Sequence, residues 1–187
     1  MQDIKRIFDS SPIIAAIKSD ELLESVIKSK ARVVFVLYGS IITLPEIVKK
    51  LKDNGKIAIV HIDLVQGLSG RDVAVDFIAQ NTKADGIIST KQNLVKYAMD
   101  LGLIAGERTF LVDSIAKENL KSHLKAFSPS FLEVMPGILP KVIKELVSVT
   151  TVPIVAGGLI SDTEDLAMIS HSGASAVSTS NPVLWQL

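Results

Sequence analysis

The segment VVFVLYGSIITLPEIVKKLKDNGKIAIVHI, residues 33–62, contains one complete unit of the pattern that decides the fold. It begins and ends with short apolar runs that start at Val33 and Ile57 and are rich in β-branched residues. Such runs are typical of strands that are buried on both faces of a parallel sheet. Because parallel neighbours need a long crossover connection, usually a helix, the segment predicts a strand, a helix and a second strand.

Helix signals lie between the apolar runs. Thr43 and Glu46 match a capping box, which predicts a helix over Leu44–Lys52. A second box at Ser161 predicts a helix over Thr163–Ser170. Where a helical segment passes directly into a strand, a glycine is expected to form a left-handed helix C-cap. The glycines in such places are Gly55, Gly102 and Gly173.

The same unit recurs along the chain, which predicts eight strands. Eight strand–helix units in a row favour a closed (β/α)8 barrel of the TIM type. Barrels of this kind usually have about 250 residues and seldom fewer than about 200, so 187 residues predict one compact domain over 1–187 with minimal loops and one or two shortened helices. A flavodoxin-like sheet is the alternative, but it leaves two or three runs unexplained. The runs begin at Ile13, Val33, Ile57, Gly86, Leu103, Phe131, Val152 and Ala174.

Composition excludes several classes of protein. The hydrophobic fraction of 48% against 21% charged residues excludes global disorder. The absence of Cys excludes disulfide frameworks, Cys-based metal centres and thiol nucleophiles, and a reducing cytoplasm is the expected location. With 20 basic and 20 acidic side chains, the chain does not resemble proteins that coat nucleic acid non-specifically. The longest uncharged stretch, Leu166–Leu187, is too polar to span a membrane.

Polar residues gather where the predicted strands end. Barrels bind ligands at the carboxyl ends of their strands, so this concentration favours a site there. Each residue taken singly has a simpler explanation, since polarity resumes wherever a strand ends. The residues are Lys18, His61, Asp63, Ser89, Thr90, Lys91, Arg108, Asp113, Glu133, Gly157, Gly158 and the loop Ser178–Asn181.

The sharpest local feature is the last pair of loops. Gly157 and Gly158 follow the seventh run, and Thr179 and Ser180 follow the eighth. In this fold, these two loops and a short helix after them form a recurrent phosphate site. Glycine lets an anion approach the backbone N–H groups closely, and hydroxyls add further donors. A tight turn would explain a Gly–Gly pair alone, but both loops in this order favour phosphate binding.

Catalytic and metal chemistry have weaker support. His61, Asp63 and Glu133 are candidates for acid–base work, and His61 could equally anchor a ligand hydroxyl or be a buried structural histidine. Lys18 and Lys91 lie at strand ends, so a Schiff-base lysine inside the barrel is not indicated. Asp63 with Glu133 could hold Mg²⁺, but three scattered histidines do not predict a metal centre.

Basic side chains cluster in two places. Because both groups lie at predicted helix ends, their attraction to the helix dipole explains them, although they could also form a local basic patch at the amino ends of the strands. Only 5% of the residues are aromatic, so stacking platforms for single-stranded nucleic acid are not suggested. The groups are Lys28, Lys30 and Arg32, and Lys49, Lys50, Lys52 and Lys56.

The strings at the strand ends, taken together and in order, resemble the glycerol uptake operon antiterminator family. The resemblance covers essentially the whole chain, and the combination is specific although Ala-Gly-Gly alone occurs in many phosphate-binding barrels. The matching strings are Ser11-Pro-Ile-Ile-Ala-Ala-Ile-Lys18, His61-Ile-Asp-Leu-Val-Gln-Gly-Leu68, Gly86-Ile-Ile-Ser-Thr-Lys91, Arg108-Thr-Phe-Leu-Val-Asp-Ser114, Glu133-Val-Met-Pro-Gly-Ile-Leu-Pro-Lys141, Pro153-Ile-Val-Ala-Gly-Gly-Leu159, and Ser178-Thr-Ser-Asn181 with Leu184-Trp185.

The resemblance implies a regulator rather than an enzyme. Proteins of this family are barrels that respond to glycerol 3-phosphate and act on leader mRNA to prevent early transcription termination. Carried over to this chain, the phosphate would bind at Gly157, Gly158, Thr179 and Ser180. By their position at the strand ends, the expected polar contacts to the glycerol end are Lys18, Asp63, Lys91 and Glu133. No cofactor and no metal are expected.

The net charge of zero restricts how such a protein would contact RNA. Any contact must be a local patch, gated by the ligand or shared across a homo-oligomer. The alternative function is an isomerase or aldolase that acts on a small phosphorylated sugar, since this barrel hosts many activities. The enzyme hypothesis predicts turnover and an essential His61, Asp63 or Glu133, whereas the sensor hypothesis predicts binding without turnover.

Overall fold

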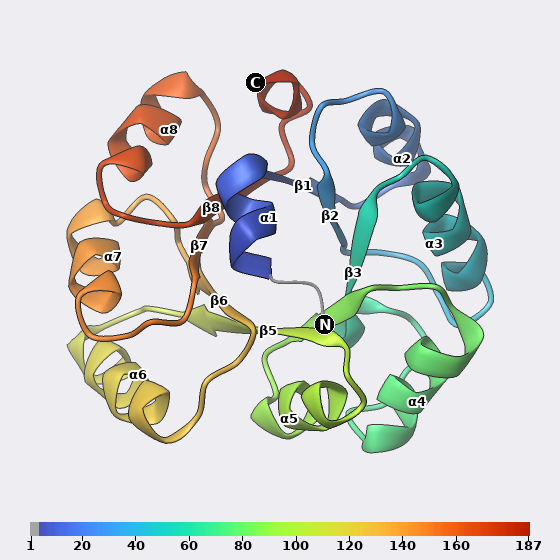
Figure 1. Cartoon of the computed structure of the whole chain (residues 1–187), viewed down its shortest axis with the longest axis horizontal. Coiled ribbons are helices and arrows are strands. Elements are labelled where there is room, and N and C mark those ends of the chain that lie inside the picture. Colours follow the sequence, from blue (N-terminus) through green and yellow to red (C-terminus); the bar gives the residue numbers. More distant parts are fainter. Residues whose placement is uncertain (1–3) are drawn as a thin grey trace.

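The computed structural model describes residues 4–187 and contains a closed barrel of eight parallel strands in sequence order (Figure 1). The predicted (β/α)8 fold is therefore confirmed, and the flavodoxin-like alternative is wrong. Every strand pairs with the next, and β8 pairs with β1 through Ile13 and Val177 to close the barrel. The strands are β1 (Ile13–Ile17), β2 (Val33–Val36), β3 (Ile57–His61), β4 (Gly86–Ser89), β5 (Ile104–Phe110), β6 (Phe131–Met135), β7 (Ile154–Gly157) and β8 (Ala176–Thr179).

Seven helices connect the strands and form the outer ring (Figure 1). Three of them, α2, α7 and α8, have only 8 residues, and the segment after β8 forms a single 3-10 turn, η2 (Leu184–Gln186). These short elements explain how 187 residues suffice for the barrel. The helices are α2 (Asp20–Ile27), α3 (Leu44–Asp53), α4 (Asp72–Asn81), α5 (Gln92–Asp100), α6 (Ser114–Ala126), α7 (Pro140–Val147) and α8 (Thr163–Ser170).

The predicted boundaries of α3 and α8 agree with the structure to within one residue, whereas the capping residues predicted for these two helices do not. The capping box at Thr43 is wrong, because the Thr43 hydroxyl accepts a hydrogen bond from the Ser40 N–H at 3.0 Å and caps no helix. At α8 the cap is Asp162, one residue later than predicted, and its carboxylate accepts from the N–H groups of Glu164 and Asp165. A carboxylate caps the positive end of a helix well. The expected left-handed glycines are confirmed, with φ of 71°, 80° and 84° at Gly55, Gly102 and Gly173.

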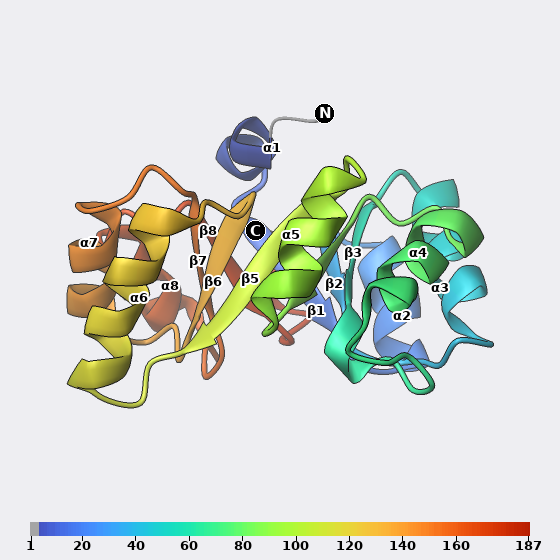
Figure 2. The same ribbon diagram turned by 90° about the horizontal axis from the view of Figure 1, so that it is seen from below.

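An additional helix, α1 (Ile4–Ser10), which the strand–helix pattern does not predict, covers the amino-terminal end of the barrel (Figure 2). Phe8 is fully buried and packs edge-on against Phe131, with ring centroids 5.7 Å apart. Phe35 stacks on Phe131 at 5.6 Å. The apolar face of α1 therefore completes the interior core at the amino ends of the strands.

The barrel interior changes from apolar to polar along the strands. Alternate residues of each strand point inward, so the interior core contains Ile14, Val33, Ile57 and their neighbours on the other strands. Nearer the carboxyl ends, the inward positions are polar. His61 is the next inward residue after Ile59 on β3, and Glu133 is the next inward residue after Phe131 on β6. Within residues 4–187, no helix is long and apolar enough to cross a membrane.

Candidate functional site

A cavity of about 190 Å³ opens at the carboxyl ends of the strands. It contains five of the predicted site residues, namely Lys18, Glu133, Gly158, Thr179 and Ser180. These residues come from the carboxyl ends of β1, β6, β7 and β8 and the positions directly after them, which the closure of the barrel brings together. The remaining lining residues are Ala16, Leu37, Arg108, Met135, Leu159, Ile160 and Ser178.

Glu133 is the centre of a hydrogen-bond network in the floor of this cavity. Its carboxylate accepts from Arg108 Nε at 2.5 Å and from Ser178 Oγ at 2.5 Å. Glu133 is 1% exposed and Arg108 is 8% exposed, so the ion pair is buried. Because both Glu133 oxygens are engaged, the network presents Arg108 rather than a free carboxylate to a ligand.

Arg108, which the sequence marks only as a polar residue at the end of a strand, has a more central position in the structure. Its Nε is bound to Glu133, and its terminal nitrogens make no hydrogen bond to residues 4–187. These nitrogens are therefore available to an anion. Arg108 lies two residues after Gly106, which in turn follows Ile104, so the inward alternation along β5 is the signal that would have identified it.

Gly157 lies beneath the cavity and is not among the residues that line it. A Cβ atom at this position would collide with the Glu133 carboxylate and the Ser178 hydroxyl. The absence of a side chain at Gly157 therefore makes room for the network. In the structure, its contribution to the site is this space rather than a surface that faces the cavity.

The loop after β7 reverses direction at two consecutive left-handed residues, Gly158 with φ of 78° and Leu159 with φ of 62°. The N–H groups of Gly158, Leu159 and Ser180 donate no hydrogen bond within residues 4–187. The Thr179 hydroxyl, in contrast, donates to the Ile160 carbonyl at 2.9 Å and so ties the two loops together. Free backbone donors at these loops are a suitable arrangement for an anion.

Asp63 and Lys91 lie together but do not line the cavity. The strand β3 ends at His61, and Asp63 lies in a 3-10 turn, η1 (Ile62–Leu64). The turn directs the Asp63 carboxylate to the loop after β4, where it accepts from Ser89 Oγ at 2.9 Å and from the Thr90 N–H at 2.8 Å. Lys91 Nζ lies 3.7 Å from the other Asp63 oxygen.

His61 is the inward-pointing residue at the end of β3 and is 2% exposed. Burial, and secondarily the positive charge of Arg108, lower its pKa from the ordinary value of 6.5 to about 4. The ring is therefore neutral near pH 7. Its Nδ1 lies 3.8 Å from Asp63 Oδ2, which is too far for a hydrogen bond.

A magnesium site at Asp63 and Glu133 finds no support in this geometry. Within the described part of the chain, no group of three or more His, Cys, Asp or Glu residues could hold a metal ion. The Glu133 carboxylate is bound to Arg108 and Ser178, and the Asp63 carboxylate to Ser89 and Thr90. The Glu133 carboxylate thus has donors on both oxygens, and the Asp63 carboxylate has donors on Oδ2 and the charge of Lys91 beside Oδ1, in place of a cation.

Most of the second basic cluster is neutralised. Lys49 pairs with Asp53 at 2.6 Å, and Lys52 pairs with Asp85 at 2.6 Å. Lys56 is buried, and its ammonium group donates to the carbonyls of Ser29 and Ala31. In contrast, Lys28 and Lys30 are exposed and pair with no carboxylate of residues 4–187.

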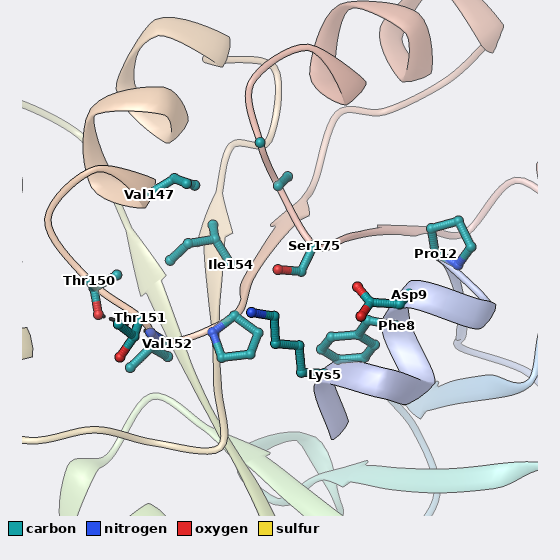
Figure 3. A pocket seen from close by; sticks show the side chains of 13 residues that line it. Lys5, Phe8, Asp9, Pro12, Val147, Thr150, Thr151, Val152, Ile154 and Ser175 are labelled. Atoms are coloured by element: carbon teal, nitrogen blue, oxygen red, sulfur yellow. Dashed lines mark hydrogen bonds between the residues drawn. The ribbon is translucent and has the colours of Figure 1, made fainter. Parts of the chain in front are cut away.

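A second hollow, of about 620 Å³, lies at the opposite end of the barrel. Figure 3 shows Lys5, Phe8 and Asp9 of α1 on one side and Thr150, Thr151 and Val152, which precede β7, on the other. This hollow is separated from the strand-end cavity by the apolar interior core. It contains none of the predicted site residues.

The fold and the cavity define a (β/α)8 barrel with a polar site at the carboxyl ends of its strands, where barrels of this class bind small ligands. Residues 13–185 match the family described as glycerol-3-phosphate responsive antiterminator. The chain belongs to this family, and the resemblance found in the sequence is confirmed.

Individual relatives agree with this assignment. The chain is 40% identical to YgcP of Escherichia coli (strain K12) over 177 residues, which cover 95% of this chain and 93% of YgcP. The crystal structure of the glycerol uptake operon antiterminator regulatory protein from Listeria monocytogenes str. 4b F2365 is similar at 33% identity, with a TM-score of 0.88 and coverage of 92% and 94%.

A glycerol uptake operon antiterminator-related protein from Thermotoga maritima MSB8 is similar at 31% identity, with a TM-score of 0.83 and coverage of 95% and 99%. Enzymes share the barrel at much lower identity. The deoxyribose phosphate aldolase from Aeropyrum pernix, at 14% identity with a TM-score of 0.73 and coverage of 95% and 89%, shows the fold alone.

Proposed function

We propose that this protein senses glycerol 3-phosphate in the cytoplasm and, in its ligand-bound state, binds leader mRNA and antiterminates transcription of glycerol-utilisation genes. The observation that carries the proposal is the strand-end cavity of a chain in the antiterminator family. In this cavity, unpaired N–H groups of two loops lie beside Lys18 and Arg108. Its volume of about 190 Å³ suits a small metabolite.

In this proposal the phosphate group lies against the loops after β7 and β8. The N–H groups of Gly158 and Ser180 and the Ser180 hydroxyl donate to it, while Thr179 holds the two loops in place. Gly157 contributes by leaving room for the network beneath. An anion at such a site is stabilised by backbone dipoles as well as by full charges.

Charge balance supports a phosphorylated ligand. The charges of Arg108 and Glu133 in the floor of the cavity offset one another, so the net positive charge at the cavity comes from the exposed Lys18. The terminal nitrogens of Arg108 still offer hydrogen-bond donors to a phosphate group. The glycerol end of the ligand would then extend from Lys18 and Glu133 toward Asp63 and Lys91. These four residues are the proposed polar contacts.

The RNA contact would be local, because the chain has no net charge. We place it near Lys28 and Lys30, which are exposed, unpaired by carboxylates of residues 4–187 and situated between α2 and β2. A ligand changes RNA affinity only if it binds the RNA-competent state more tightly than the other state. Assembly into a homo-oligomer would multiply this small basic surface.

The enzyme alternative has less support from the same residues. A catalytic base works best with a pKa near the working pH, and the pKa of His61 is lowered to about 4. Glu133 is fixed by two donors, and Asp63 by a second set. We therefore propose binding without turnover.

A thermal-shift screen of phosphorylated three- to six-carbon metabolites tests the proposal, followed by leader-RNA binding across salt concentrations. Glycerol 3-phosphate at about 100 times its Kd is expected to add about 2.7 kcal/mol to the free energy of unfolding. RNA binding should strengthen in its presence. The absence of a shift, or consumption of the ligand, would contradict the sensor function.

A further inference from the structure

Two buried polar atoms, Nδ1 of His61 and Oδ1 of Asp63, have no hydrogen-bond partner within residues 4–187. No other buried side-chain nitrogen or oxygen in that part of the chain is in this state. Unpartnered buried polar atoms are rare because each loses its hydrogen bonds to water without replacement. Two of them beside one another indicate a place where an external group completes the hydrogen bonds.

His61 adjoins the wall of the strand-end cavity. The pairing of Val36 with Val60 places the next residues, Leu37 and His61, side by side at the carboxyl ends of β2 and β3. Leu37 lines the cavity. The charge of Arg108, which also lines the cavity, acts on the His61 ring across the interior.

Asp63 is held in one orientation. Three donors, Ser89 Oγ, Thr90 N and Thr90 Oγ1, all bind its Oδ2 at 2.8 to 3.3 Å. Its Oδ1 is left without a donor, with Lys91 Nζ at 3.7 Å. The carboxylate is thus held in place, and its Oδ1 forms an ion pair with Lys91 but accepts no hydrogen bond within residues 4–187.

We infer that His61 and Asp63 form a hydroxyl-binding subsite that selects a polyol phosphate and sets its orientation. A ligand hydroxyl donates its proton to Asp63 Oδ1 and forms a second hydrogen bond with His61 Nδ1. This inference rests on the proposed function, because it takes a phosphorylated ligand as given. It adds which end of the ligand faces β3 and how alkyl phosphates are rejected.

The chemistry of the subsite favours a hydroxyl over an anion. The Asp63 carboxylate and the Lys91 ammonium group offset one another, and the neutral imidazole adds no charge, so the subsite has no net positive charge to attract a phosphate group. The phosphate therefore binds at the loops after β7 and β8, and the hydroxyl end points to β3. A ligand without hydroxyls leaves both polar atoms without a hydrogen bond. Sites of this kind strongly reject an analogue that lacks the hydroxyl group, because their buried polar groups are then left unpaired.

Titration calorimetry with glycerol 3-phosphate, n-propyl phosphate and inorganic phosphate tests this inference at pH 7.5. The wild type is expected to bind glycerol 3-phosphate at least tenfold more tightly than n-propyl phosphate. His61→Leu should lose this preference yet keep the affinity for n-propyl phosphate within about threefold. His171→Leu, at an exposed position on another face, is the matched control and should behave like the wild type.

Two outcomes separate this inference from the proposed function. If the wild type binds none of the three compounds, the proposed function fails. If it binds glycerol 3-phosphate and His61→Leu retains the preference, only the hydroxyl subsite is overturned. Asp63→Asn, which replaces the free acceptor by a donor, is an independent second variant and should also lower the preference.

The stability of the unliganded variants guards against a merely structural effect. Because Nδ1 is unpartnered, His61→Leu should unfold at the same temperature as the wild type or higher. His123, whose Nε2 is bound to Glu107 at 2.8 Å, is a partnered histidine, so His123→Leu should unfold at a lower temperature. An equal loss in both variants would show that His61 is satisfied within the protein and would overturn the inference.

Discussion

Arg108 on β5 and Glu133 on β6 form a buried ion pair in the floor of the strand-end cavity, and the β5–β6 register places the two residues directly opposite one another. The pair lies between the apolar core of the barrel and the proposed ligand. Its geometry therefore links the stability of the barrel to the chemistry of the site.

Replacing one residue of the Arg108–Glu133 pair should lower the free energy of unfolding more than replacing both. Arg108→Met or Glu133→Leu alone leaves an uncompensated buried charge, and each is expected to lower the free energy of unfolding by about 3–5 kcal/mol. The double variant should recover most of this loss, because no buried charge remains. Urea denaturation of the four proteins measures the coupling, and simple addition of the two single losses would contradict a direct ion pair.

Gly157→Ala should disturb the same network from below. The added Cβ would collide with the Glu133 carboxylate and the Ser178 hydroxyl, and overpacking of this kind usually costs about 1–3 kcal/mol. Gly102→Ala is the control, since a Cβ there meets nothing within 4 Å and the cost comes from the left-handed backbone alone. Gly157→Ala should reduce the ligand-induced thermal shift while Gly102→Ala leaves it intact. Equal ligand-induced thermal shifts in the two variants would show that Gly157 does not contribute to the site.

His61 should make the protein less stable at acidic pH. Its pKa is about 4 when folded and near 6.5 when unfolded, so the unfolded chain binds more protons between these values. The free energy of unfolding therefore falls as the pH drops from about 6.5 toward 4, by up to about 3 kcal/mol from this group. Subtracting the pH profile of His61→Leu from that of the wild type isolates the contribution of His61. A difference profile without slope would contradict the buried neutral ring.

Sequence reasoning recovered the barrel because its signal is repeated. The apolar runs at Val33, Ile57 and the six other positions each begin at the start of a strand or within two residues before it, and the spacing left room for helices between them. The helix α1 was missed because it has only seven residues, and their burial depends on the interior core, where Phe8 meets Phe131.

The site was recovered only in part, for a similar reason. Lys18, Glu133 and the two loops follow from strand position, since every carboxyl end points to the same mouth. Asp63 was expected at the end of a strand, but β3 ends at His61 and the 3-10 turn directs the Asp63 carboxylate to the loop after β4. The Arg108–Glu133 pair depends on the register of two strands, and a pattern in one strand cannot supply it.

Gly158→Asp should abolish the response to glycerol 3-phosphate. The substitution places a carboxylate next to the unpaired N–H groups at which the phosphate is proposed to bind, and like charges repel. Gly158 has φ of 78°, and Asp tolerates this backbone better than most residues, so the barrel should still fold. Differential scanning fluorimetry with and without ligand gives the measurement. A shift equal to that of the wild type would rule out the loop after β7 as the phosphate site.

Charge reversal at Lys28 and Lys30 should weaken RNA binding without affecting the ligand. Each neutralised phosphate contributes to the salt dependence of RNA affinity, with a slope of about −0.7 per contact for single strands. If both lysines contact leader RNA, Lys28→Glu with Lys30→Glu should reduce the slope of log affinity against log salt by more than about one.

The matched control is Lys49→Glu with Lys50→Glu, at positions already paired with Asp53 and Glu24. This double variant makes the same change in net charge on α3, so it separates a local contact from a general electrostatic effect. Equal losses of RNA affinity in both double variants would indicate that RNA binding depends on the overall charge of the protein rather than on a local contact. If the slope is unchanged in both double variants, the RNA does not bind at the α2–β2 loop. Loss of a phosphate contact at that loop would also remove the counterion release that this contact contributes to the slope.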